Sequence, residues 1–177
     1  MTGRLFLVVG PSGAGKDTLL SGAVAQDARL HWARRVITRP ETAGGEPFEG
    51  VDEATFAARL AAEDFALYWQ AHGLHYGVPK AELAPLAQGR DVLVNGSRAA
   101  LAAAHAAFPG LIVLHVTAPI PVLAARLALR GRETAADIEA RLARADLGLP
   151  AGFVAREVVN DDSPAMGIAR LIQALRG

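Results

Sequence analysis

Short, mainly apolar runs alternate along the chain with longer segments of helical periodicity. We expect strands at four of these runs: Leu5–Val9, Asp91–Asn95, Leu111–Val116 and Val154–Val159. Apolar runs of this length are typical of strands that are buried on both faces. Helices are expected at Lys16–Ala25, Glu53–Ala62, Lys80–Gln88, Ala99–Ala107 and Pro119–Arg130, from about Thr134, and after Ser163-Pro164. This alternation predicts an α/β fold with a central parallel sheet, whose ligands bind at the carboxyl ends of the strands.

The region between about residues 35 and 80 has a different pattern. Arg35–Thr38 is a short extended piece that Pro40 ends. Ala66–Gln70 and Leu74–Val78 are expected to be extended, with a turn at His72-Gly73 between them. The acidic residues of this region are most simply explained as a solvated loop and a helix cap: Glu41, Glu46, Glu49, Asp52 and Glu53.

The composition is that of a globular protein with a sizeable core. The chain has 177 residues, of which 51% are hydrophobic and 20% charged, and we expect a single domain over residues 1–177. Its 18 basic and 18 acidic residues balance, which argues against nucleic-acid or anionic-membrane partners. There is no cysteine, so disulfides and thiolate chemistry are excluded. With no membrane-length apolar run and no signal-like start, a soluble cytoplasmic protein is expected.

A glycine-rich loop with one lysine follows the first strand directly and opens a helix. Its pattern is G-x-x-x-x-G-K, the phosphate loop of nucleotide-binding proteins. Glycines let backbone N–H groups surround phosphate oxygens, the helix N-terminus favours negative charge, and Lys16 reaches the β- and γ-phosphates. We therefore expect ATP to bind at Gly10, Pro11, Ser12, Gly13, Ala14, Gly15, Lys16, Asp17 and Thr18.

The residue after the phosphate-loop lysine departs from the usual pattern. Asp17 stands where a serine or threonine normally holds Mg²⁺, and Thr18 follows at once. Mg²⁺ prefers hard oxygen ligands, so the Asp17 carboxylate and the Thr18 hydroxyl both suit it. The sequence leaves open which of the two holds the metal.

Arginines gather in the segment of about residues 126–145. Arg126 and Arg130 share one helix face, Arg141 and Arg144 share another, and Arg132 lies between them next to Gly131. Two such helices are expected to form a lid over polyphosphate, because arginine binds phosphate through two parallel hydrogen bonds and stays charged. The alternative is a solvated helical hairpin without a role in binding.

Several motifs together resemble the guanylate kinase family over nearly the whole chain. They are Gly10–Lys16, Val36–Pro40, His72–Lys80, Gln88–Val94, Arg130–Thr134 with Arg141, and Val159–Asp162. The resemblance implies a P-loop NTPase three-layer sandwich with an acceptor-binding insertion at about 35–80 and the arginine lid. It also implies catalytic roles for Lys16, Arg130 and Arg141, phosphate contacts for Arg39 and Tyr76, and a place beside adenine for Asn160.

Other positions depart from the guanylate kinase pattern. Leu67 and Val78 stand where that family reads guanine with a glutamate and a serine. Asn95 and Ser97 replace two aspartates after the central strand. Aliphatic side chains would leave the hydrogen-bond donors of guanine buried and unpaired. The residues that recognise guanine are therefore expected to be missing from this chain.

The same departures resemble the ribose 1,5-bisphosphate phosphokinase family of phosphonate catabolism. Asp17 and Asn95-Gly-Ser-Arg98 are the most specific matches. The resemblance implies that ATP, with Mg²⁺, phosphorylates ribose 1,5-bisphosphate to 5-phosphoribosyl 1-diphosphate, and that Asn95, Ser97 and Arg98 contact the sugar phosphate. An anionic phosphate acceptor needs no general base, so His72 and His75 are expected to be structural.

Two alternatives remain at this stage. One is a nucleoside monophosphate kinase, which Leu67 and Val78 disfavour. The other is a catalytically inactive kinase fold used for protein interaction, which the presence of Lys16, Arg130 and Arg141 disfavours. The sequence leaves open whether the protein forms a homodimer.

Overall fold

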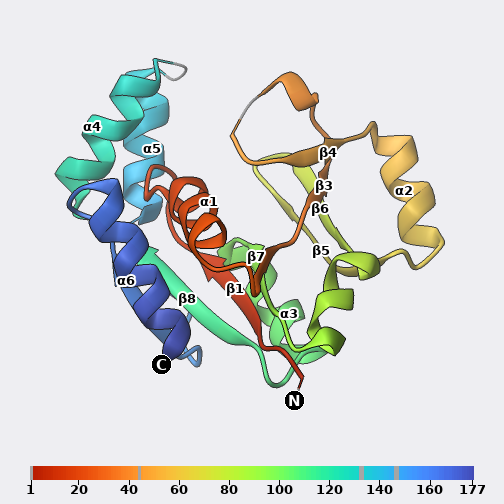
Figure 1. The fold of residues 1–177 in the computed structure, drawn as a ribbon. Helices are drawn as coiled ribbons and strands as arrows, with labels where there is room; N and C mark the ends of the chain where they lie inside the picture. Colours follow the sequence, from red (N-terminus) through yellow and green to blue (C-terminus); the bar gives the residue numbers. More distant parts are fainter. Residues whose placement is uncertain (1, 44, 132–133, 146–147) are drawn as a thin grey trace.

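A five-stranded parallel sheet forms the centre of the molecule (Figure 1). The computed structural model describes residues 2–43, 45–131, 134–145 and 148–177 of the chain. Every neighbouring pair in the sheet is parallel. Its strands, in spatial order, are β2 (Leu30–Trp32), β7 (Asp91–Asn95), β1 (Leu5–Val9), β8 (Ile112–Thr117) and β9 (Ala155–Val159).

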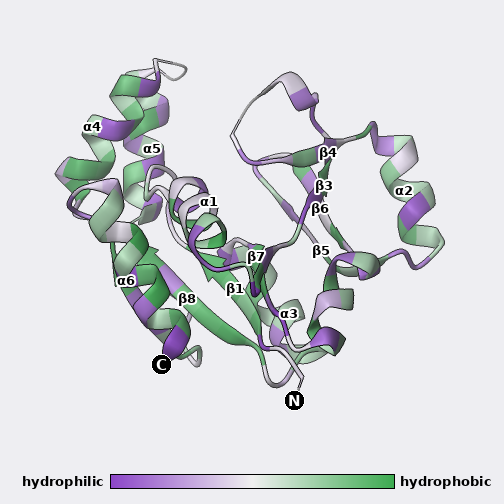
Figure 2. Ribbon diagram, in the orientation of Figure 1, coloured by the Kyte–Doolittle hydropathy of each residue, from purple (hydrophilic) through white to green (hydrophobic). Residues whose placement is uncertain are grey.

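Helices cover both faces of this sheet, which confirms the expected three-layer arrangement. Alternate residues of a strand point to opposite faces, and both faces here are buried. Phe6 and Val8 pack in one core with α1 (Lys16–Gln26) and α6 (Pro164–Arg176). Leu7 and Val9 pack in a second core with α3 (Leu101–Ala107). The central strands are accordingly the most continuously hydrophobic part of the ribbon (Figure 2).

A second, smaller sheet is built from the region between residues 35 and 80. Its order is β4 (Phe48–Gly50), β3 (Arg35–Ile37), β6 (Leu74–Pro79) and β5 (Phe65–Ala71). The helix α2 (Glu53–Ala61) packs on it through Phe56, and the Asp52 side chain caps α2 by accepting from the Thr55 N–H. The expected turn at His72-Gly73 joins β5 and β6 directly, since Ala71 pairs with Leu74.

The helices α4 (Ile120–Arg130) and α5 (Ala135–Ala145) pack against each other. They stand on the other side of α1 from the small sheet (Figure 1). Gly131 ends α4 in the left-handed conformation, and Thr134 and Asp137 bond each other's backbone N–H in the expected capping box. Arg132, one of the arginines of the expected lid, lies outside the described residues.

The structure differs from the expected elements where the pattern is short or interrupted. The three-residue strands β2 and β4 were not expected, because three residues show no measurable periodicity. Lys80–Gln88 forms a 3₁₀ helix (η2) instead of an α-helix, and Pro85 inside it has no N–H for a helical hydrogen bond. The described residues also form two short 3₁₀ turns, η1 (Glu41–Ala43) and η3 (Arg98–Ala100).

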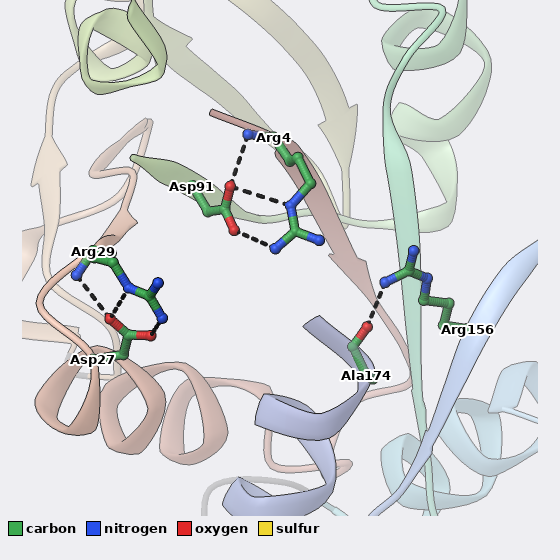
Figure 3. A network of polar contacts seen from close by, with 6 residues as sticks. All are labelled: Arg4, Asp27, Arg29, Asp91, Arg156 and Ala174. Carbon is green, nitrogen blue, oxygen red and sulfur yellow. Dashed lines mark hydrogen bonds and ion pairs between the residues drawn. The ribbon is translucent and has the colours of Figure 1, made fainter. Parts of the chain in front are cut away.

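Polar contacts fix the strands at the edge of the sheet opposite the phosphate loop (Figure 3). Arg4, just before β1, bonds the Asp91 carboxylate at the start of β7 through its backbone N–H and its guanidinium. Arg156 of β9 donates to the carbonyl of Ala174 over 2.7 Å and so holds α6. Within the described residues, no helix is both long and apolar enough to span a membrane.

Candidate active site

The phosphate loop lies between the carboxyl end of β1 and the first turn of α1, as the sequence predicts. Gly15 has a φ of 87°, and a Cβ there would lie 2.6 Å from the Asn160 Nδ2 atom. The position therefore requires glycine for both its conformation and its space. Asn160 in turn donates to the Ala14 carbonyl over 2.7 Å and is buried, so it supports the loop from behind.

Lys16 lies inside the loop that precedes it. Its Nζ atom donates to the carbonyls of Gly10 over 2.8 Å and Pro11 over 3.2 Å. Burial lowers the pKa of Lys16 to about 8; nearby Asp17 opposes this effect, and the guanidinium groups of Arg35 and Arg130 add to it. A cation with so much positive charge around it is suited to receive a polyanion.

One cleft of about 220 Å³ brings together most of the residues singled out in the sequence. From the nucleotide side it is lined by Gly10, Ser12, Gly13, Gly15, Lys16, Asp17, Thr18 and Arg130. The other part, called the acceptor half because its residues are those expected to bind the acceptor, is lined by Arg39, Tyr76, Asn95 and Ser97. Residues expected to bind the nucleotide and residues expected to bind the acceptor thus border one cleft, as phosphoryl transfer between the two would require.

The remaining ATP and acceptor residues lie elsewhere. Ala14 of the loop is fully buried, and Pro11 and Arg98 line a second cavity beside the cleft. Asn160 borders a third cavity of about 410 Å³ together with Thr18, Arg126 and Arg130. The third cavity lies on the side of the loop where the nucleotide base was expected.

Two arginines of the expected lid contact the phosphate loop. Arg141 of α5 donates to the Ser12 hydroxyl, and Arg126 of α4 donates to the Gly13 carbonyl over 3.4 Å. Arg130, the last residue of α4, borders both the cleft and the third cavity. The two helices therefore lie close enough to the loop to surround a bound polyphosphate.

An aromatic pair forms a wall of the acceptor half. Trp69 of β5 and Tyr76 of β6 are cross-strand partners whose rings stack, with centroids 5.4 Å apart and planes 4° apart. The Arg35 guanidinium lies 5.0 Å from the centroid of the Tyr76 ring. Leu67 and Val78 pair directly on the same hairpin, but they are buried in the core and do not line the cleft.

A buried chain of polar side chains crosses the cleft and corrects one expectation. Glu46 is only 7% exposed and pairs with the buried Arg35, with 2.9 Å between Arg35 Nε and Glu46 Oε2. Its Oε1 atom lies 3.4 Å from Asn95 Nδ2, which also donates to Asp17 Oδ1 over 2.8 Å. Assigning Glu46 to a solvated loop was therefore wrong, because its partner Arg35 comes from a separate strand.

Six residues that border the cleft were not predicted as site residues: Arg35, Glu46, Trp69, Ala71, His72 and Gly96. Local sequence gives no signal for the first two, since a buried ion pair forms only after folding. Trp69 Nε1 and Ser97 Oγ are buried without a hydrogen-bond partner among the described residues. Buried polar groups of this kind are expected to find partners in a ligand or in water.

The residues present fit a magnesium ion. The Asp17 carboxylate and the Thr18 hydroxyl both line the cleft at the start of α1, next to Lys16. Both are hard oxygen ligands, and Mg²⁺ in phosphoryl-transfer sites needs only one or two from the protein because phosphates and water supply the others. A larger cluster of protein ligands is not needed for Mg²⁺. The described residues contain no group of three or more His, Cys, Asp or Glu side chains that could hold a metal ion.

Curated proteins are 46–50% identical to this chain over nearly its whole length. It is 50% identical to ribose 1,5-bisphosphate phosphokinase PhnN of Ruegeria sp. (strain TM1040), over 97% of the chain and 90% of that protein. It is 46% identical to the protein of the same name from Rhizobium etli (strain CIAT 652), over 99% of the chain and 90% of that protein. It also matches the bifunctional ribose 1,5-bisphosphokinase-thymidine phosphorylase of Cupriavidus necator at 47% identity, spanning 29% of that longer protein.

Solved structures share the fold at low sequence identity. Guanylate kinase from Anaplasma phagocytophilum superposes with a TM-score of 0.69 at 19% identity, over 99% of this chain and 85% of that one. A gluconokinase from Sinorhizobium meliloti 1021 gives a TM-score of 0.55 at 18% identity, over 99% of this chain and 92% of that one. No protein-family model matches the chain. The superpositions confirm the P-loop kinase fold that the motifs predict.

Proposed function

We propose, since the chain belongs to the ribose 1,5-bisphosphate phosphokinase family, that it transfers the γ-phosphoryl group of ATP to ribose 1,5-bisphosphate. The products are ADP and 5-phosphoribosyl 1-diphosphate. The observation that supports this most is the single cleft, where the phosphate loop faces a cationic acceptor half that has no guanine reader. Residues 1–177 then act as one kinase domain, with residues 35–80 binding the acceptor and residues 126–145 as the lid.

The reaction needs positioning and positive charge more than proton transfer. An oxygen of the acceptor's C1 phosphate, already anionic, attacks the γ-phosphorus, and the bond to the β-phosphate oxygen breaks. Lys16, Arg130 and Arg141 stabilise the charge on the phosphate oxygens during transfer. A Mg²⁺ ion held by Asp17 or Thr18 would supply further charge neutralisation.

The acceptor half suits a sugar phosphate better than a nucleobase. In this proposal Arg39 and Tyr76 hold the acceptor phosphate and Asn95 and Ser97 bond sugar hydroxyls, which is supported by their position in the lining of the cleft. Trp69 and Tyr76 limit the width of the cleft with their stacked rings. At the positions where guanylate kinases read the base, Leu67 and Val78 are turned into the core.

The experiment that tests the proposal is an acceptor panel with Mg·ATP. Ribose 1,5-bisphosphate, GMP, AMP and gluconate are supplied separately, and products are identified by ³¹P NMR. We expect turnover with ribose 1,5-bisphosphate far above the other three. A preference for GMP would assign a nucleoside monophosphate kinase, and ATP binding without turnover of any acceptor would favour an inactive interaction module.

A further inference from the structure

A second cavity of about 220 Å³ adjoins the main cleft and is strongly cationic. The two cavities share the walls formed by Ser12, His72 and Ser97. The second one is further lined by Arg98, Arg141 and Arg144. Among the described residues that line it, none is an aspartate or a glutamate. An anion is therefore the class of ligand that this cavity fits.

Arg98 positions the arginines of this cavity. Its guanidinium donates to the carbonyl of Arg144 over 2.7 Å and to that of Gly148 over 2.9 Å. These bonds hold the last turn of α5 against η3. Arg141 and Arg144 lie three residues apart on α5, so they project from the same helix face toward the cavity. Arg141 is fixed further by its bond to Ser12.

His72 stands on the opposite wall, in the tight turn between β5 and β6. The φ angles of His72 and Gly73 are 53° and 73°, as in a type I′ hairpin turn. Asparagine is the residue most favoured at the first position of such a turn, so histidine is not the best choice for the turn alone. His72 lines this cavity together with Arg141 and Arg144. Partial desolvation, then Arg141 and Arg144, and then Lys16 lower the pKa of its imidazole.

The acceptor of the proposed reaction carries two phosphates, and this inference rests on that proposed function. The main cleft receives the C1 phosphate, which must meet the γ-phosphate beside Lys16. We propose that the second cavity binds the phosphate monoester at C5 of the same sugar, through His72, Arg144 and Arg141. Because the two cavities share walls, one sugar can present a phosphate to each. The cavity then selects acceptors that carry a terminal phosphate.

The test compares ligands that carry only one of the two phosphates. Binding of ribose 5-phosphate and of ribose 1-phosphate is measured by titration calorimetry for the wild type and for His72→Asn and Arg144→Gln. We expect both variants to bind ribose 5-phosphate about tenfold more weakly, the loss of roughly one charge-assisted hydrogen bond, and ribose 1-phosphate unchanged. Asparagine suits the turn at residue 72, so a loss of affinity in that variant reports on the imidazole.

Kinetics with the bisphosphate provide a second readout. For both variants we expect the KM for ribose 1,5-bisphosphate to rise about tenfold while the KM for ATP stays unchanged. His105→Asn is the matched control, because His105 is exposed and borders neither cavity. Equal losses for the two monophosphates, or no loss for either, would overturn the assignment of this cavity.

The two proposals fail in different ways. If the wild type does not phosphorylate ribose 1,5-bisphosphate but binds ribose 5-phosphate in a manner that depends on His72 and Arg144, the proposed function is wrong and the cavity assignment stands. If the wild type phosphorylates the bisphosphate and both variants behave as wild type, the proposed function stands and the cavity assignment is wrong.

Discussion

The side-chain amide of Asn95 donates a hydrogen bond of 2.8 Å to the Asp17 carboxylate, across 78 positions of the chain. Asn95 ends β7 and Asp17 lies in the first turn of α1, so this bond joins the acceptor half of the cleft to the nucleotide half. Asp17 Oδ1 accepts this bond, and the carboxylate keeps acceptor capacity for the metal that it is expected to bind. The carboxylate is thus oriented by its neighbour before any ligand arrives.

Replacement of Asp17 by alanine should separate metal use from nucleotide binding. We expect the variant to lose more in turnover of Mg·ATP than in binding of metal-free ATP, because the carboxylate repels the phosphates unless a cation lies between them. Kinetics with Mg·ATP and an ATP titration without metal check this. Thr18→Val is the matched variant for the other candidate ligand. Equal losses in both measurements would remove the metal role from Asp17.

Replacement of Glu46 by alanine should destabilise the fold strongly. The change leaves the Arg35 guanidinium buried without its carboxylate partner, and breaking a buried pair in this way costs about 3–5 kcal/mol. Urea unfolding gives the free energy of unfolding. The control is Glu41→Ala, which removes an exposed ion pair with Arg34 and should cost less than about 1 kcal/mol. Similar values for the two variants would contradict the structural importance of the buried pair.

The affinity for ATP should fall as the pH rises above 8. In the free protein the pKa of Lys16 is about 8, and bound phosphates favour its charged form, so above pH 8 binding must include uptake of a proton. Below pH 8 Lys16 is already protonated in the free protein, so this group adds no pH dependence to ATP binding. ATP titrations across this range check the slope, and Lys16→Arg should abolish it because arginine stays protonated. A pH dependence retained in Lys16→Arg would assign the slope to another group.

The same pKa shift has an opposite sign for folding. The pKa of Lys16 is lower in the folded protein than its value of 10.5 in a model compound, so between these values the unfolded chain binds more protons. Stability should therefore rise with pH from about 8 toward 10.5 through this group. Urea unfolding of the wild type and of Lys16→Met at several pH values measures the difference. A wild type and variant with parallel stability profiles would count against the shift.

Replacement of Asn160 by alanine should weaken ATP binding more than acceptor binding. The change removes the donor to the Ala14 carbonyl and leaves that buried group unpaired, which costs about 1–3 kcal/mol in a comparable setting. We expect a higher KM for ATP and an unchanged KM for the acceptor. Asp161→Asn serves as control because its bond to Arg170 is exposed. An effect on both substrates alike would indicate general loss of structure instead.

The features that depend on neighbours along the chain could be predicted from the amino-acid sequence. The buried strands, the phosphate loop around Lys16, the turn at His72-Gly73 and the caps at Asp52 and Ser163 all follow from periodicity and local backbone preferences. The motifs also predicted the kinase fold and the family. These features are short-range, so a single sequence contains the information.

The side chains that meet across the cleft could not be predicted before the fold was known. Glu46 and Arg35 come from separate segments and are buried together, and Leu67 and Val78 face the core instead of the acceptor. Arg98 bonds the carbonyl of Arg144 at the end of α5, and His72 lines one cavity with Arg141 and Arg144. The physical reason is that hydrogen bonds and ion pairs between distant segments depend on how the two sheets and the lid pack, and no local pattern specifies that packing.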